Sequence, residues 1–404
     1  MEIPVATPVA TLVTNRGQAD VVILGGGIAG LWLLDCLIQA GYSAILLNKG
    51  PLGQGQSIAA QGIIHGGTKY FGATAVSDLA AMPARWQASL RDEAGPDLRT
   101  APPLAPAMQM WLPRQLGGAI MAGFAKKAMR GTLSERPSHE RPSILPQGPG
   151  GRLFDVDEIV VDPAKVLGAL RDLHPDHIRC LSNDSGLTMN LRDDGYVDVD
   201  TDGIKLRAQR VVLTSGVGNE ALLNQAGIKG IPCQRRPLRQ IMLRGMTQAV
   251  YLHCIGKNPK PLATITSHPD QTGGYYWYVG GLLAEQGADQ TPEVSIKAAR
   301  RELHRLLPGA DYSRAKWATH RVDRAEPGGS GLLPGSAMAV AKGPVIVGWP
   351  TKLALAPVLA DKIMTLLQDG NVTPGPHDTA ALTSFTAAPA TIAKPPWELV
   401  DKWN

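Results

Sequence analysis

The most regular hydrophobic pattern of this chain lies in its first fifty residues. Residues 21–24 (VVIL) form an uninterrupted apolar run, which is typical of a parallel strand buried on both faces. Residues 31–40 have the length and composition of a helix, Gly41 ends it, and residues 43–47 form a second apolar run. The pattern therefore predicts a strand–helix–strand unit.

The turn inside this unit is rich in glycine and reads GGGIAG over residues 25–30. Gly25 permits the tight turn, Gly27 lets the backbone approach a pyrophosphate, and Gly30 lets helix and strand pack closely. The helix N-terminus adds N–H donors and a positive dipole. Because the strand, turn, helix and second strand are all in place, the motif predicts a dinucleotide site; the alternative is a glycine-rich turn with no ligand.

The second strand ends at Asn48, 18 positions after Gly30, where dinucleotide-binding proteins usually carry an acid that accepts hydrogen bonds from the ribose. Asparagine can still accept through its carbonyl oxygen. It lacks the negative charge that would repel a 2′-phosphate. Asn48 alone therefore does not distinguish FAD from NADP.

Residues 53–70 (GQGQSIAAQGIIHGGTKY) follow as a loop of small residues. At this point the chain resembles the D-amino-acid oxidase superfamily of FAD enzymes, which includes glycine and sarcosine oxidases. Residues 64–70 resemble the histidine-glycine-glycine motif of its glycerol-3-phosphate dehydrogenase branch and, more loosely, the corresponding segment of 2-hydroxyglutarate oxidases. The resemblance implies an α/β fold, with a Rossmann-like FAD-binding domain and a second α+β substrate domain on a mainly antiparallel sheet.

Three later segments are similar to this family. Residues 159–167 resemble the segment before the helix that returns the chain to the FAD domain, and residues 210–216 resemble its apolar strand that ends beside the cofactor. Residues 344–357 resemble the strand-to-helix junction beneath the flavin, where N–H groups and Lys352 would stabilise the charge of reduced flavin. Otherwise Trp349 is a core residue and Lys352 an exposed lysine. The predicted FAD-binding residues are Gly25, Gly27, Ile28, Ala29, Gly30, Asn48, Lys49, Gln56, Ser57, Gln61, Gly62, Ile63, Ser215, Gly216, Gly348, Trp349, Thr351, Lys352 and Leu353.

These segments predict an FAD-binding domain made of three pieces, residues 19–84, 150–230 and 335–370. The substrate domain comprises residues 85–149, expected as helices and loops, and the strand-rich residues 231–334. Residues 1–18 and 371–404 are terminal extensions, the second rich in Thr, Ala and Pro and expected as an extended wrap or a mobile end.

His65 is the leading candidate for the catalytic base, because imidazole titrates near neutral pH and glycines follow it in the sequence. The resemblance implies a histidine at the flavin in this motif. The alternative is a histidine with a structural role. Basicity and simple contact with the flavin both stay open.

Arginine or lysine would hold an anionic substrate. Residues 317–323 resemble the family segment that presents such an arginine, which implicates Arg321; the alternative is a surface ion pair. Lys69 stands where the glycerol phosphate branch has arginine, which places a phosphate substrate in doubt. Alternation puts Tyr276 and Tyr278 on one face of a strand, either as a wall of the substrate cavity or as ordinary sheet core.

Composition narrows the class of protein further. The net charge is +5 and the sequence isoelectric point is near 9.0, with basic residues scattered rather than in runs, which suits small anionic ligands and gives no reason to expect nucleic acid. The four cysteines lie far apart and predict neither a metal site nor a disulfide framework. We expect a cytoplasmic protein without a secretory signal or transmembrane segment.

The resulting prediction is an FAD-dependent oxidase or dehydrogenase. It would oxidise a small anionic amine, amino acid or 2-hydroxy acid by hydride transfer to flavin, with oxygen, a quinone or another acceptor taking the electrons. A flavin-binding electron-transfer or regulatory subunit is the second class, since fold does not determine function. An RNA-modifying amine oxidase is a third, which the scattered charge does not favour.

Overall fold

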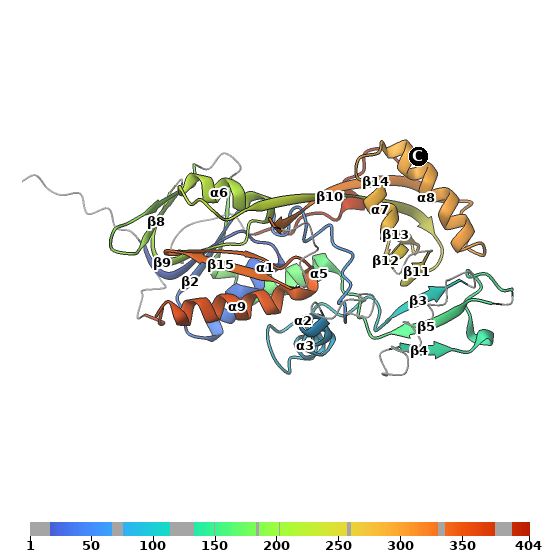
Figure 1. The fold of residues 1–404 in the computed structure, drawn as a ribbon, viewed down its shortest axis with the longest axis horizontal. Helices are drawn as coiled ribbons and strands as arrows, with labels where there is room; N and C mark the ends of the chain where they lie inside the picture. Colours follow the sequence, from blue (N-terminus) through green and yellow to red (C-terminus); the bar gives the residue numbers. More distant parts are fainter. Residues whose placement is uncertain are drawn as a thin grey trace, which may run out of the picture.

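The computed structural model describes residues 17–66, 76–113, 133–148, 150–182, 186–201, 203–256, 260–329, 336–375 and 390–404. Within these ranges the chain forms two eight-stranded sheets, which occupy opposite ends of an elongated molecule (Figure 1). Each sheet has its own hydrophobic core.

The first sheet contains the predicted strand–helix–strand unit. Its elements are β1 (Gly17–Leu24), β2 (Ala44–Lys49), β6 (Ile178–Leu181), β7 (Thr188–Leu191), β8 (Val197–Thr201), β9 (Ile204–Leu213), β15 (Met338–Lys342) and β16 (Val345–Trp349), with α1 (Ile28–Gln39), α5 (Pro163–Leu173), α6 (Asn219–Gln225) and α9 (Ala356–Asp369). Strands β16, β9, β1, β2 and β6 are parallel neighbours, β15 joins antiparallel to β16, and the β7–β8 hairpin extends from β9.

The apolar run in β1 is buried on both faces, as predicted. Val21 and Ile23 pack into the core formed with α1, α5 and α9. Val22 and Leu24 pack into the opposite core, which β8, β9 and α6 complete. Double burial is the condition that allows every position of a central parallel strand to be apolar.

The second sheet is mainly antiparallel. Its strands are β3 (Met108–Leu112), β4 (Leu133–Arg136), β5 (Arg152–Val156), β10 (Cys233–Met246), β11 (Leu252–Ile255), β12 (Pro261–Pro269), β13 (Tyr275–Gly280) and β14 (Lys316–Pro327), and its helices are α7 (Leu282–Gln286) and α8 (Pro292–Leu306). Helices α2 (Val76–Ala80) and α3 (Met82–Leu90) instead pack into the core of the first sheet, to which they contribute Leu79, Met82 and Trp86. The strand order is β14-β10-β13-β12-β11-β3-β5-β4, and only the β11–β3 pair is parallel. Helices α7 and α8 contribute Leu283, Ile296 and Leu303 to the core on one face.

Two details differ from the sequence-based boundaries. Strand β5 lies inside the range 150–230 but belongs to the second sheet, where it pairs with β3 and β4. The range 85–149, expected as helices and loops, contributes β3 and β4 to that sheet. The reason is that β3 takes its partners from segments far away in the chain, and a short apolar run shows no sign of such partners.

Strands β10 and β14 form a long ribbon that runs from one sheet to the other (Figure 1). Ala325, near the end of β14, packs in a core of the first sheet, whereas Trp317, near its start, packs in the core of the second. A continuous pair of strands therefore sets the distance between the two sheets.

The C-terminal residues 390–404 run along both parts of the molecule. Leu52 donates its N–H to Thr391 O at 2.7 Å, and Asn404 exchanges two backbone hydrogen bonds of 2.8 Å with Trp317. Trp397 is buried between these contacts, next to Tyr278. These residues form the extended wrap that was one of the two expectations.

Candidate active site

The glycine-rich turn joins β1 to α1 and lines a large cavity. A Cβ on Gly25, which has φ of +118°, would lie 2.6 Å from Ser215 N, and a Cβ on Gly30 would lie 2.0 Å from the carbonyl oxygen of Gly25. Gly27 is the N-cap residue of α1, and it has no side chain that could accept hydrogen bonds from the first N–H groups of the helix. Helix α1 begins at Ile28, three residues earlier than expected, so the motif itself forms its first turn.

Two polar side chains hold this turn in place. The Ser57 hydroxyl accepts the Ile28 N–H at 3.0 Å, and Asn48 Oδ1 accepts the Gly26 N–H at 2.8 Å. Asn48 Nδ2 donates to Gly50 O at 2.9 Å. The Asn48 amide thus links the end of β2 to the glycine turn by hydrogen bonds. That it accepts a hydrogen bond from a ribose hydroxyl stays a prediction.

The cavity has a volume of about 1800 Å³. Both sheets contribute to its wall, together with the loop over residues 53–63 and the C-terminal segment. Gly30 is absent from the wall because it lies in the helix–strand contact. The other predicted FAD-binding residues line the cavity: Gly25, Gly27, Ile28, Ala29, Asn48, Lys49, Gln56, Ser57, Gln61, Gly62, Ile63, Ser215, Gly216, Gly348, Trp349, Thr351, Lys352 and Leu353.

The loop over residues 53–63 is held between the two sheets. Gln56 Oε1 accepts the Ala325 N–H at 3.0 Å, and Gln61 Nε2 donates to the backbone oxygens of Thr264 and Tyr278, both at 2.9 Å. At Gly62, where φ is +71°, a Cβ would lie 1.9 Å from Val161 O. The loop is therefore a fixed part of the cavity wall.

The junction between β16 and α9 forms another part of the wall. Thr351 adopts φ of +60°, and its hydroxyl donates to Ser336 O at 3.2 Å. Burial lowers the pKa of Lys352, while the charge of Glu326 raises it and that of Arg324 lowers it. Trp349 is 1% exposed, so it is a core residue that also lines the cavity. The core alternative therefore holds for Trp349, while its contact with FAD stays a prediction.

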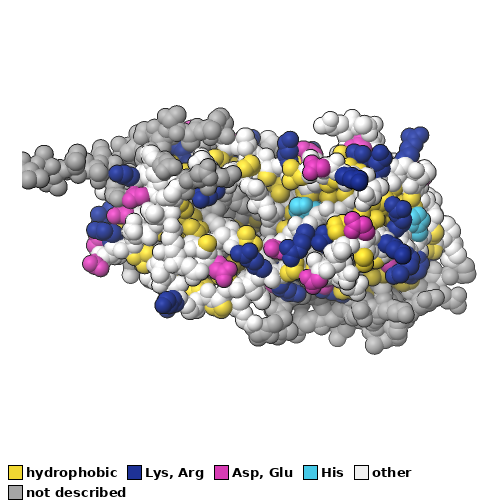
Figure 2. Space-filling view, turned by 90° about the horizontal axis from the view of Figure 1, so that it is seen from above, with side chains coloured by type: hydrophobic (Ala, Val, Ile, Leu, Met, Phe, Trp, Pro, Cys, Tyr) yellow, Lys and Arg dark blue, Asp and Glu magenta, His cyan; other side chains and the backbone are white. Residues whose placement is uncertain are grey.

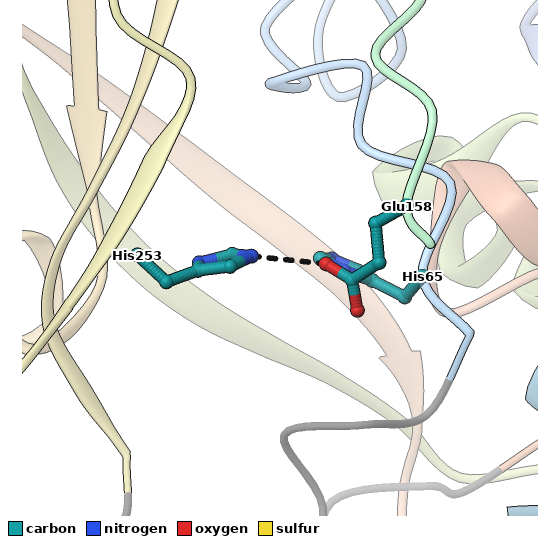
Figure 3. Close-up of side chains that lie close together, drawn as sticks. All are labelled: His65, Glu158 and His253. Atoms are coloured by element: carbon teal, nitrogen blue, oxygen red, sulfur yellow. Dashed lines mark hydrogen bonds and ion pairs between the residues drawn. The ribbon is translucent and has the colours of Figure 1, made fainter. Parts of the chain in front are cut away.

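His65 lines the cavity and lies beside the buried Glu158, which also contacts the buried His253 (Figure 3). Its Nδ1 lies 3.3 Å from Oε2 of Glu158, and Nε2 of His253 lies 2.9 Å from the same oxygen. On its other side, His253 Nδ1 lies 3.0 Å from the Thr264 hydroxyl. Burial alone would raise the pKa of Glu158, but the two histidines outweigh it and hold that pKa well below its usual range.

Arg321 lies on β14 at the edge of the cavity and is 47% exposed. Its Nη1 forms an ion pair of 3.2 Å with Asp323 Oδ1. Burial lowers the pKa of the neighbouring His320. Arg321 thus lines the cavity and forms the ion pair of the second sequence-based alternative, while its binding of a substrate anion stays a prediction.

The two predicted tyrosines, Tyr276 and Tyr278, lie elsewhere. Lys69 is outside the described residues. Tyr276 and Tyr278 share one face of β13, as the alternation predicted, but neither is among the described residues that line the cavity. The Tyr278 hydroxyl is buried and donates to Ala59 O at 3.0 Å, and Tyr276 stacks on Trp397 with ring centroids 5.8 Å apart. These contacts support the alternative in which both tyrosines belong to the sheet core.

The sequence analysis missed Glu158 and His253 as site residues. Glu158 directly precedes the apolar run 159–161, and an acid next to a buried strand-like segment is a signal that could have been followed. His253 had no such signal, because it meets Glu158 only through the pairing of β11 with its neighbours. The C-terminal residues 391–394 were also missed as part of the cavity wall.

The fold and cavity define a dinucleotide-dependent oxidoreductase. The N-terminus of α1 opens on the cavity, where Gly27 carries no side chain and a Cβ would lie 2.9 Å from the Ser57 hydroxyl. Seven Lys and Arg residues line the cavity against three Asp and Glu residues, which suits the pyrophosphate of a dinucleotide. The residues present therefore fit FAD.

The chain belongs to the DAO family, the FAD dependent oxidoreductases, whose model matches residues 20–344. It is 42% identical over 390 residues to the probable FAD-dependent oxidoreductase PA4991 of Pseudomonas aeruginosa, covering 95% of this chain and 98% of that protein. The crystal structure of PA4991 superimposes with a TM-score of 0.82 over 96% of this chain and 99% of that chain, at 37% identity. The predicted family and cofactor are confirmed.

Two more distant structures share the fold. Glycine oxidase from Geobacillus kaustophilus gives a TM-score of 0.67 at 16% identity, covering 92% of this chain and 100% of that chain. The L-alpha-glycerophosphate oxidase from Mycoplasma pneumoniae, solved with FAD bound, gives 0.64 at 15% identity, covering 89% and 97%. At these identities the likeness shows the fold alone.

The surface fits the sequence-based view of charge. On the face shown in Figure 2, Lys and Arg side chains are interspersed with acidic and apolar ones. In the part of the chain that the structure describes, every helix is too short or too polar to cross a membrane.

Proposed function

We propose that this FAD-dependent oxidoreductase oxidises a small anionic amine, amino acid or 2-hydroxy acid at a C–N or C–O bond. The observation that carries the proposal is the pair His65 and Arg321, a candidate base and a candidate anion ligand that line one cavity with the FAD-binding residues. Phosphate remains less favoured, because Lys69 replaces the arginine of the glycerol phosphate branch.

FAD, when bound, supplies the acceptor for the hydride. The N-terminus of α1 and the glycine turn would face its pyrophosphate, and Lys352 with the start of α9 would face negative charge on the reduced flavin. These residues bind and orient; they do not take part in bond breaking.

The substrate steps fall to Arg321 and His65. Arg321 would exchange its ion pair with Asp323 for the substrate carboxylate, which costs little because both side chains are partly exposed. His65 would accept the O–H or N–H proton of the substrate while the hydride leaves carbon. Loss of the proton and the hydride leaves the carbonyl or imine product, and His65 then releases its proton to solvent.

The test is an anaerobic titration of the yellow holoenzyme with glycine derivatives, D- and L-amino acids, 2-hydroxy acids and glycerol 3-phosphate, followed by absorbance. Bleaching by only amino compounds assigns C–N oxidation, and bleaching by only hydroxy compounds assigns C–O oxidation. If FAD is bound and none of these donors bleaches it, while a protein partner reduces it, the protein belongs to the electron-transfer class.

An Arg321→Leu variant tests the anion clamp. We expect KM to rise at least about tenfold, since a charge-assisted hydrogen bond contributes about 1.5–3 kcal/mol. Arg301→Leu is the matched control, because Arg301 is an exposed arginine of α8 that pairs with Glu302 away from the cavity. An unchanged KM in Arg321→Leu would remove the clamp from the proposal.

A further inference from the structure

Three side chains from distant segments meet at the cavity wall and form one hydrogen-bonded chain (Figure 3). His65 follows the loop over residues 53–63, Glu158 lies just after β5, and His253 lies on β11. Glu158 and His253 are fully buried, and the side chain of His65 is 14% exposed. Only His65 among the three lines the cavity.

The central group is a buried carboxylate. A carboxylate taken out of water is stable only when hydrogen bonds and positive charge compensate its desolvation. Two ring nitrogens lie 2.9 and 3.3 Å from Glu158 Oε2, and together they hold the pKa of Glu158 well below its usual range. Both separations are hydrogen-bond distances to one oxygen, so the geometry fits a carboxylate that accepts from both rings.

An ionised carboxylate can only accept hydrogen bonds, which determines where the ring protons lie. The His65 nitrogen that faces it, Nδ1, must carry hydrogen, so in the neutral ring Nε2 carries the lone pair. His253 likewise donates from Nε2 to Glu158. Its Nδ1 lies 3.0 Å from the Thr264 hydroxyl, a group that can donate to it, so His253 can remain neutral while fully buried.

We propose that Glu158, anchored by His253 and Thr264, is a positioning residue that keeps His65 in the Nδ1–H tautomer and stabilises the imidazolium formed during turnover. The inference rests on the proposed function, in which His65 is the base. Carboxylate partners act in this way on catalytic histidines and on metal-ligating ones.

The step balances in protons and electrons. The substrate O–H or N–H bond breaks and its proton forms a bond to His65 Nε2, while a hydride carrying two electrons leaves the substrate carbon for the flavin. The substrate becomes a carbonyl or imine, Glu158 keeps its charge, and His65 later releases its proton to solvent.

The same three residues offer ligand atoms that lie within 4.8 Å of one another, so a divalent metal ion is the competing interpretation. Metal binding would require the proton between His253 and Glu158 to leave. The 2.9 Å separation is a hydrogen-bond distance and favours the proton-carrying arrangement.

The experiment compares the holoenzyme with its Glu158→Gln variant, which removes the charge and keeps the shape. Asp35→Asn is the matched control, because Asp35 is also a buried carboxylate that pairs with a histidine, His174 at 2.9 Å, yet lies away from the cavity. His253→Gln is the second variant, since glutamine can still donate to Glu158; it serves if Glu158→Gln fails to fold.

Two readouts are measured. With a substrate from the panel, we expect the rate constant of anaerobic flavin reduction to fall at least about 100-fold in Glu158→Gln, the scale of acid–base catalysis, with FAD content unchanged. The acidic limb of its pH profile should move to lower pH, because the carboxylate no longer favours the imidazolium. The rate constant should fall less in His253→Gln than in Glu158→Gln. Asp35→Asn should change neither the rate constant nor the position of the acidic limb.

The second readout needs no substrate. Nitrogen-15 NMR of the imidazoles, with His65 assigned by its loss in His65→Gln, should show the Nδ1–H tautomer in the wild type and a different tautomer balance in Glu158→Gln. If no donor reduces the wild type but this change occurs, the proposed function fails and the positioning role stands. An unchanged His65 signal overturns the positioning role, and so does stoichiometric zinc that Glu158→Gln releases.

Discussion

Gly30 gives the sharpest structural prediction, because the contact that requires glycine is with backbone. A Cβ at this position would lie 2.0 Å from the carbonyl oxygen of Gly25, about 1.4 Å short of ordinary contact at 3.4 Å, and 2.8 Å from Thr214 Oγ1. Neither the glycine turn nor α1 can yield alone, since β1 lies at the centre of the parallel sheet. A Gly30→Ala substitution must therefore separate α1 from the turn.

The expected loss of stability is about 3 kcal/mol or more, at the upper end of the range for overpacking. Gly168→Ala is the matched control. It lies inside helix α5, where an added Cβ would meet nothing within 4 Å, so the same change should stabilise the protein by about 1 kcal/mol through helix propensity. The two variants add the same methyl group, and the expected changes in the free energy of unfolding have opposite signs.

The assay is urea unfolding of both variants, followed by tryptophan fluorescence, together with FAD content after gel filtration. We expect Gly30→Ala to lose most of its FAD, because displacing α1 by about an ångström moves the N–H groups that face the pyrophosphate. Full FAD content and wild-type stability in Gly30→Ala would refute the packing argument, and a destabilised Gly168→Ala would refute the reasoning behind the control.

Three further predictions concern residues around the cavity. Tyr278→Phe should lose about 1–2 kcal/mol in urea unfolding, because Ala59 O loses its buried donor, with the flavin reduction rate unchanged; a large loss of that rate would return Tyr278 to the catalytic residues. Burial lowers the pKa of His268 to about 3, below the ~6.5 of an unfolded histidine. The contribution of neutral His268 to the free energy of unfolding is therefore complete above pH ~6.5 and decreases as the pH drops below it. At pH 5 the loss relative to pH 7 is about 2 kcal/mol, and urea unfolding of His268→Phe should lack it. Lys352→Met should lower the flavin midpoint potential by about 30 mV, the equivalent of ~1.4 kcal/mol, whereas an unchanged potential in spectroelectrochemistry would place Lys352 away from the flavin charge.

The cofactor half of the molecule was predictable because its signals are local. The glycine motif is recognisable within one strand–turn–helix unit, where Gly30 meets the carbonyl oxygen of Gly25, and the apolar runs of β1 and β2 follow from burial on both faces of a parallel sheet. Ser215 and Lys352 could be added from short segments similar to the family, and both line the cavity.

The catalytic half was less predictable because its residues meet through long-range pairing. The alternation in strand β13 left open whether its tyrosines face the cavity or the sheet core, and they pack against Trp397 from the far end of the chain. The predicted piece 150–230 assigned strand β5 to the FAD-binding domain for the same reason, since its partner β3 is some forty residues earlier in the chain. Alternation shows that a strand has two faces but not what covers each of them.

The sequence by itself determined the family, the FAD-binding turn and the presence of a histidine and an arginine suited to an anionic substrate. Only the tertiary structure decided that Glu158 lies between His65 and His253 and that Arg321 forms an ion pair with Asp323. The physical reason is that the glycine spacing and the apolar runs around it are local patterns in the sequence, whereas a histidine's role depends on which buried carboxylate the folded sheets bring to it.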